Sequence, residues 1–101
     1  MVSPNTELVG KYFYLDGLDK RIIKVGHVGV NDSHEMRIAV YGTELNMENG
    51  VFRYDTDGYL LNKLIGPLDR KTLADCRKDA RKRKFPEETI LFLGGKIKKK
   101  R

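Results

Sequence analysis

The chain of 101 residues carries a net charge of +6, with 40% apolar and 34% charged residues, a polar balance that is still typical of a globular protein. This length predicts one domain with a modest core and leaves little chain for a second lobe or a deep substrate cleft. No apolar run approaches the roughly 20 residues that a membrane-spanning helix needs, and the single cysteine, Cys76, excludes an internal disulfide.

Residues 1–7 contain neither basic residues nor an apolar stretch, so they do not have the features of a secretory signal peptide. Together with the lone cysteine, this predicts a reducing, cytoplasmic location.

Three β-strands are expected in the first part of the chain. Residues 11–15 are rich in aromatic side chains, which favour strands. In residues 21–30 the apolar alternation changes phase at Gly26, which indicates a bulge or a sharp bend. Residues 36–41 alternate most regularly between apolar and other side chains, and we expect Gly42 to end this strand.

Two further strands, residues 51–55 and 59–61, are expected to pair as a hairpin around Thr56-Asp57-Gly58. Short strands between turn residues make residues 8–65 β-rich and favour a small sandwich or barrel.

The hydrophobic period changes in the last third. Asp69 is placed to cap a helix over residues 69–84, in which Leu73, Cys76 and Ala80 form one apolar stripe. We expect the apolar run of residues 89–93 to be a strand that returns to the sheet.

Three short segments of the first half resemble the small bacterial and phage SH3-like, Tudor-type barrels. They are Gly10-Lys11-Tyr12-Phe13, Gly26-His27-Val28 and Val40-Tyr41. The resemblance implies a five-stranded barrel whose loops, or whose appended helix, bind protein or nucleic acid. Residues 69–101 have no counterpart in that pattern.

The positive charge is concentrated at the C-terminal end. Residues 69–84 contain eight Lys or Arg and three Asp, and residues 96–101 contain five Lys or Arg and no acid, whereas residues 1–68 contain seven basic and nine acidic residues. Such asymmetry favours a polyanionic partner.

The expected helix presents its cations on two faces. One face carries Lys71, Lys78 and Lys82 beside Asp75 and Asp79, at spacings that predict internal ion pairs. The other edge carries no acid and is suited to phosphate contacts, because guanidinium groups form forked hydrogen bonds to oxygens. We call this edge the basic edge of the helix, and its members are Arg70, Arg77, Arg81 and Lys84. A solvated helix face without a ligand is the competing interpretation.

The tail, residues 96–101, is expected to be flexible and to extend this surface. Its cations would release counterions from a nucleic-acid backbone, although such tails also serve solubility, acidic membranes or localisation. They are Lys96, Lys98, Lys99, Lys100 and Arg101.

The tail has no aromatic residue, so base stacking would need the tyrosines of the β-rich region. The candidates are Tyr12, Tyr14, Tyr41 and Tyr54, and packing within the core is the competing interpretation for each.

No metal, cofactor or catalytic site is expected. His27, His34 and Cys76 are scattered without the spacing of metal ligands, and no Gly-rich phosphate loop precedes a helix. Cys76 on the apolar stripe is expected to be a small buried residue.

We therefore predict an α+β fold over residues 1–95. It consists of a mostly antiparallel SH3-like barrel or curled sheet, one C-terminal basic helix and a return strand. The expected function is non-catalytic binding of DNA or RNA. The alternative is a protein-interaction module that binds an acidic protein or self-associates.

Overall fold

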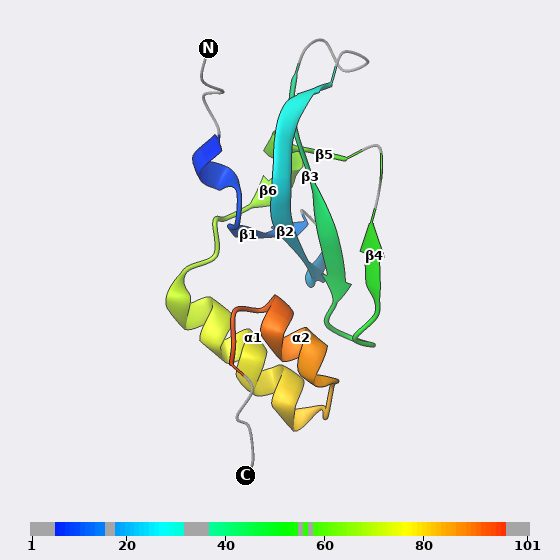
Figure 1. Ribbon diagram of the computed structural model, residues 1–101, viewed down its shortest axis with the longest axis vertical. Coiled ribbons are helices and arrows are strands. Elements are labelled where there is room, and N and C mark those ends of the chain that lie inside the picture. Colours follow the sequence, from blue (N-terminus) through cyan, green and yellow to red (C-terminus); the bar gives the residue numbers. More distant parts are fainter. Residues whose placement is uncertain (1–5, 16–17, 32–36, 55, 57, 97–101) are drawn as a thin grey trace.

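An antiparallel sheet and two helices form the computed structural model, which describes residues 6–15, 18–31, 37–54, 56 and 58–96 (Figure 1). The strands lie side by side in the order β4-β3-β2-β1-β6, and β5 also pairs with β3. Their bounds are β1 Tyr12–Leu15, β2 Leu18–Asn31, β3 Arg37–Asn46, β4 Phe52–Tyr54, β5 Tyr59–Leu60 and β6 Leu64–Ile65. The α+β class is confirmed, but the sheet does not close into a barrel.

The expected hairpin between residues 51–55 and 59–61 is wrong. Within the described residues, β4 pairs with β3 at Thr43–Leu45, and β5 pairs with β3 further along, at Ala39 and Val40. Both short strands therefore pair with the same edge of β3. This edge is ten residues long, and each short strand covers only part of it.

The long pair β2–β3 contains the predicted bulge. Val25 pairs with Gly42 and His27 pairs with Tyr41, so Gly26 is the extra residue. Gly42, however, does not end its strand, since β3 continues to Asn46. A Cβ at Gly42 would lie 1.9 Å from the carbonyl oxygen of Lys24, so the glycine allows a close approach of the two backbones.

Helix α1 spans Arg70–Lys82 and starts as predicted, with the Asp69 carboxylate accepting a hydrogen bond from the backbone N–H of Thr72 at 2.8 Å. It ends two residues earlier than expected. Lys84 has a positive φ of 62° and lies outside the helix. The amides of Lys84 and Phe85 donate to Arg81 O and Ala80 O, which is the Schellman arrangement of a helix end.

The expected return strand at residues 89–93 is also wrong, because Glu87–Phe92 form a second helix, α2. Pro86 precedes it, and Glu87 and Glu88 occupy its first turn, where negative charge is favoured. At its C-terminal end Gly94 has a φ of +86°, and Gly94 and Gly95 donate to Leu91 O and Ile90 O. The helix and its C-cap bury Ile90 and Leu93, three residues apart, which a strand would place on opposite faces.

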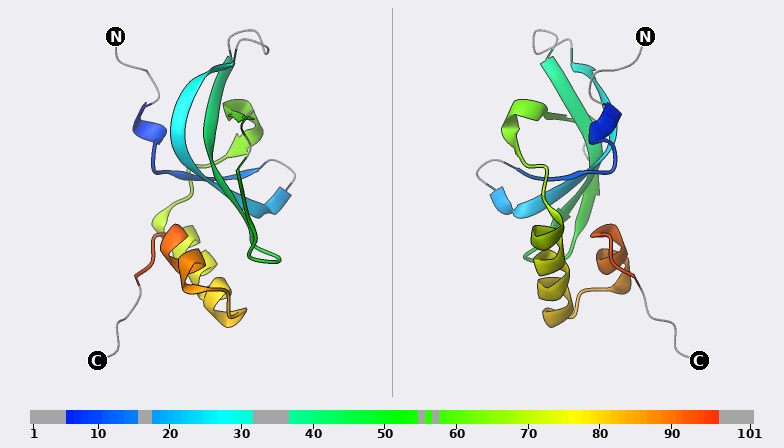
Figure 2. Two further views of the ribbon diagram at one scale, coloured as in Figure 1. Left: turned by 45° about the vertical axis from the view of Figure 1, so that its right-hand side comes forward. Right: turned by 90° about the vertical axis from the view of Figure 1, so that its left-hand side faces the viewer.

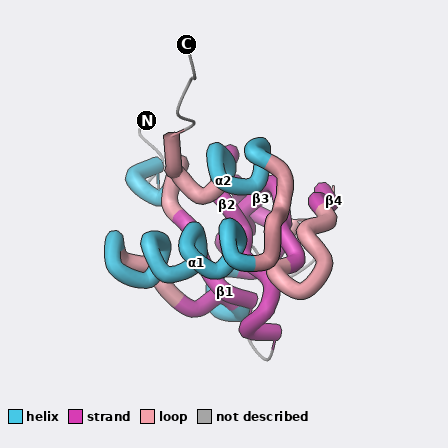
Figure 3. The backbone as a smooth tube through the Cα atoms, turned by 90° about the horizontal axis from the view of Figure 1, so that it is seen from below, coloured by secondary structure: helices cyan, strands magenta, loops and turns pink. Residues whose placement is uncertain are grey.

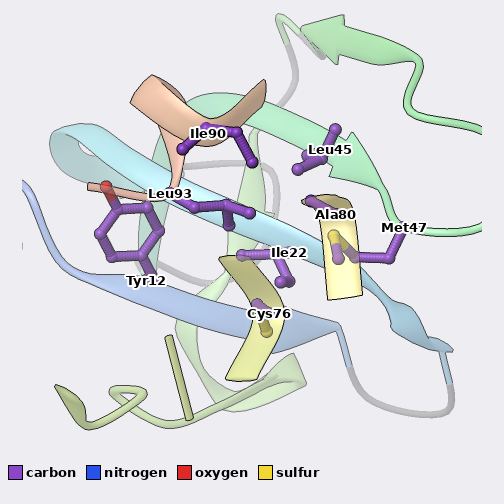
Figure 4. Close-up of a cluster of buried hydrophobic side chains, with 8 residues drawn as sticks. All are labelled: Tyr12, Ile22, Leu45, Met47, Cys76, Ala80, Ile90 and Leu93. Carbon is purple, nitrogen blue, oxygen red and sulfur yellow. The ribbon is translucent and has the colours of Figure 1, made fainter. Parts of the chain in front are cut away.

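The two helices lie side by side at one end of the sheet (Figures 2 and 3). The larger core fills the space between them and the sheet, and Figure 4 shows its buried members, Tyr12, Ile22, Leu45, Met47, Cys76, Ala80, Ile90 and Leu93. The opposite face of the curled sheet carries a smaller core around Phe13, Val25 and Val40.

Among the described helices, none is long and apolar enough to span a membrane.

Candidate nucleic-acid interface

The basic edge of α1 is partly exposed as predicted. Arg70, Arg77 and Arg81 follow one another at seven and four residues, so they project from the same side of the helix. Arg70 and Arg81 are exposed, whereas Arg77 is half-buried. Lys84 is exposed as well, but it extends from the chain reversal after the helix.

Arg77 is engaged inside the protein. Its Nη1 donates a hydrogen bond of 2.8 Å to the carbonyl oxygen of Leu93, at the C-terminal end of α2. The neighbouring carbonyl of Phe92 accepts from the Tyr12 hydroxyl. These donors satisfy carbonyl groups that a helix end leaves without an intrahelical partner, and the Arg77 cation faces the negative end of the short helix. Part of its guanidinium is therefore used in holding α2 against α1.

The same contact brings the start of the tail beside the basic edge. A Cβ at Gly95 would lie 2.8 Å from Cδ of Arg77, so the backbone at Gly95 rests directly on the arginine side chain. The next residue, Lys96, is exposed. Lys98, Lys99, Lys100 and Arg101 lie outside the described residues.

The ion pairing expected on the lysine face of α1, opposite the apolar stripe, takes a different form. Asp79 pairs with Arg83 at 3.1 Å, an i,i+4 pair at the C-cap rather than a contact with the predicted lysines. Lys71, Lys78 and Lys82 are exposed there. Arg83 lies four residues after Asp79, about one helical turn further along, so its guanidinium group can reach back to the Asp79 carboxylate.

Cys76 is buried on the apolar stripe, as predicted. Burial raises the pKa of its thiol above the ordinary value of 9.0, and Tyr14 Oη lies 3.7 Å from its Sγ. The neutral thiol is thus favoured at physiological pH, which does not suit a nucleophile.

The four tyrosines divide into two pairs. Tyr12 is 7% exposed in the larger core, and Tyr14 packs against the same cluster. Tyr41 and Tyr54 instead line an open pocket on the helix-facing side of the sheet, where Tyr54 is 58% exposed. Tyr54 is thus the most exposed of the four rings, and it shares its pocket with Tyr41.

The pocket also contains a cation that the sequence did not single out. Lys24 lines it, with Nζ 5.5 Å from the centre of the Tyr12 ring. Alternation within β2 placed Lys24 opposite Ile23 and Val25, but it did not say which residues of other strands would lie beside it. That depends on the register set by the Gly26 bulge.

A buried carboxylate was missed as well. Glu44 is 4% exposed, accepts a 2.9 Å hydrogen bond from the Tyr59 hydroxyl, and pairs with Arg21 at 3.3 Å. Its partners satisfy both oxygens, which makes this network a structural tie between β2, β3 and β5.

Comparisons of the chain with protein-family models, with curated proteins and with solved structures found no match.

Proposed function

We propose that this chain is a non-catalytic nucleic-acid-binding protein that holds phosphates with the basic edge of α1 and with its basic tail. The observation that carries the proposal is the contact of Arg77 with Leu93 O and Gly95, because it joins the two positive segments. Arg70, Arg81, Lys84 and Lys96 are exposed around that contact. Such a surface would bind the phosphate backbone without reading the base sequence.

An SH3-like curl of the sheet belongs to the same proposal. Its support is that β5 pairs with β3 and β6 pairs with β1, while one short 3-10 turn, Leu61–Lys63, joins β5 to β6. The chain thus passes from one side of the sheet to the other within a few residues. We also place the protein in the cytoplasm, where a lone thiol such as Cys76 stays reduced.

Salt dependence of binding tests the phosphate contacts. If about six cations are neutralised, the affinity for a labelled 20-mer duplex should fall about 1,000-fold between 50 and 200 mM salt. Fluorescence anisotropy at a series of salt concentrations measures this slope.

Two matched variants locate the surface. We expect Arg81→Ala to lower the salt slope by about one and Lys63→Ala, in the 3-10 turn between β5 and β6, to leave it unchanged. Both side chains are exposed, so neither variant should disturb the fold. Absence of binding at 50 mM salt, or equal effects of the two variants, would refute the proposal.

The exposed edge of β4 favours a second candidate, self-association by strand pairing. β4 is the last strand on its side of the sheet, and Val51 and Tyr54 beside this edge are 57% and 58% exposed. Sedimentation distinguishes the two functions. A dimer that persists in 1 M salt and after removal of residues 96–101 would favour strand pairing, since strand pairing, unlike phosphate binding, depends neither on low salt nor on the basic tail.

A further inference from the structure

The helix-facing side of the sheet carries a cross-strand row of side chains that the helices do not cover completely. Lys24 on β2 is paired with Thr43 on β3, and Thr43 is paired with Tyr54 on β4. Directly paired residues project to the same face of a sheet, so these three side chains stand next to one another. They line a pocket of about 380 Å³.

Aromatic rings enclose this row on two sides. Tyr41 and His27, the pair that follows the Gly26 bulge, have ring centres 5.6 Å apart, and Phe92 of α2 lines the pocket from the helix side. The Tyr41 ring is held in place, because a Cβ at Gly58 would lie 2.6 Å from it. The pocket thus offers a fixed aromatic ring and a second, exposed ring at Tyr54.

The charge of the pocket suits an anionic aromatic ligand. Lys24 supplies a cation, Thr43 supplies a hydroxyl, and no carboxylate is found among the described residues that line it. A nucleotide has these two parts, a flat base and a phosphate, and bases of any sequence stack on tyrosine rings.

The pocket also adjoins the proposed phosphate surface. Phe92 lines the pocket, and the carbonyl of the next residue, Leu93, accepts the hydrogen bond from Arg77. The C-terminal end of α2 therefore contributes both to the pocket and to the contact with the basic edge of α1. A single strand that crosses Arg77 and Lys96 would pass this end of α2.

We propose that this pocket binds one base of a single-stranded nucleic acid, stacked on Tyr54 and Tyr41, with a neighbouring phosphate at Lys24. The inference rests on the proposed function and narrows its ligand to single strands, because the faces of a base are covered in a duplex and free in a single strand.

Two ligands that share a backbone separate base binding from phosphate binding. The probes are a labelled 12-mer of thymidylate and an abasic deoxyribose-phosphate 12-mer of equal charge, titrated by anisotropy at one salt concentration. We expect the wild-type protein to bind the thymidylate about tenfold more tightly, which is the size of one stacked base.

Substitutions of Tyr54 locate the effect. Tyr54→Leu should remove the tenfold preference and leave binding of the abasic 12-mer and its salt slope unchanged, whereas Tyr54→Phe should keep the preference. Val51→Ala, at an exposed residue of the same sheet edge that does not line the pocket, is the matched control.

The failures are distinguishable. If the wild-type protein binds both 12-mers equally, or if Tyr54→Leu weakens both equally, the base pocket is refuted and the phosphate surface stands. If the wild-type protein binds neither 12-mer, both proposals fail. Displacement of the thymidylate by an acidic peptide of glutamates, abolished in Tyr54→Leu, would assign the pocket to a protein partner and overturn the inference.

Discussion

At the scale of single residues, two cations of the basic edge have structural positions that their sequence spacing did not reveal. Arg77 donates to the end of α2, and Lys84 adopts the left-handed backbone conformation that closes α1. A side chain with a Cβ is disfavoured in that conformation by about 1 kcal/mol or more, which is why glycine is the usual residue there. Lys84 therefore costs stability while it adds a positive charge.

Replacement of this lysine by glycine should stabilise the protein. We expect Lys84→Gly to raise the free energy of unfolding by about 0.5–1 kcal/mol, since relief of the strain exceeds the added freedom of the unfolded chain. Urea denaturation measures the change. Lys82→Gly, two residues earlier in the regular helix, is the matched control and should lower the free energy by about 0.5–1 kcal/mol. A destabilised Lys84→Gly would contradict the left-handed geometry.

At the scale of secondary-structure elements, α2 shows how a short apolar run can be misassigned. Five apolar or β-branched residues, 89–93, fit a buried strand as well as a helix turn by pattern alone. The residues at the two ends decide: Pro86 with two glutamates begins the helix, and Gly94 with Gly95 closes it. These signals were present in the sequence, and the apolar run outweighed them in the prediction.

Paired alanine substitutions distinguish the helix from the strand. Leu93 is fully buried and Leu91 is 49% exposed, although a strand would place both on one face. We expect Leu93→Ala to lower the free energy of unfolding by about 3 kcal/mol and Leu91→Ala to change it by less than about 0.5 kcal/mol. Similar losses in thermal or urea unfolding for the two variants would support the strand.

At the scale of the whole molecule, the β2–β3 pair connects the two cores. Ile22 and Leu45 face the helices, while Val25 and Val40 face the smaller core on the other side. Gly42 lies in the middle of this pair, where the backbone of Lys24 leaves no room for a Cβ. A displacement of the two strands at this point would disturb both cores and the pocket at once.

A methyl group at this position should therefore be strongly destabilising. We expect Gly42→Ala to lower the free energy of unfolding by about 3 kcal/mol or more, because the atom in its way belongs to the backbone. Gly26→Ala, on the opposing strand, is the control: its Cβ would be 3.6 Å from the nearest atom, an ordinary contact. A shift of less than about 1 kcal/mol is expected there in urea unfolding. Similar free energies of unfolding for the two variants would show that the backbones of β2 and β3 lie further apart at Gly42.

The sequence by itself determined the elements whose signals are local. The strand β3, the phase change at Gly26 and the Asp69 cap of α1 each depend on residues within one strand or one helix turn, and all three are confirmed. The alternation expected in β3 is not strict, because Ala39 and Val40 are both buried. The burial of Cys76 followed from helix periodicity in the same way.

Only the tertiary structure decided which distant residues meet. β4 and β5 share β3 instead of each other, Arg77 reaches Leu93, and Lys24 joins Thr43 and Tyr54 in one pocket. These contacts depend on strand register and on the docking of α2, and a one-residue change of register would turn every side chain to the other face. Local patterns carry no information on that choice, because it is made by the packing of the two cores as a whole.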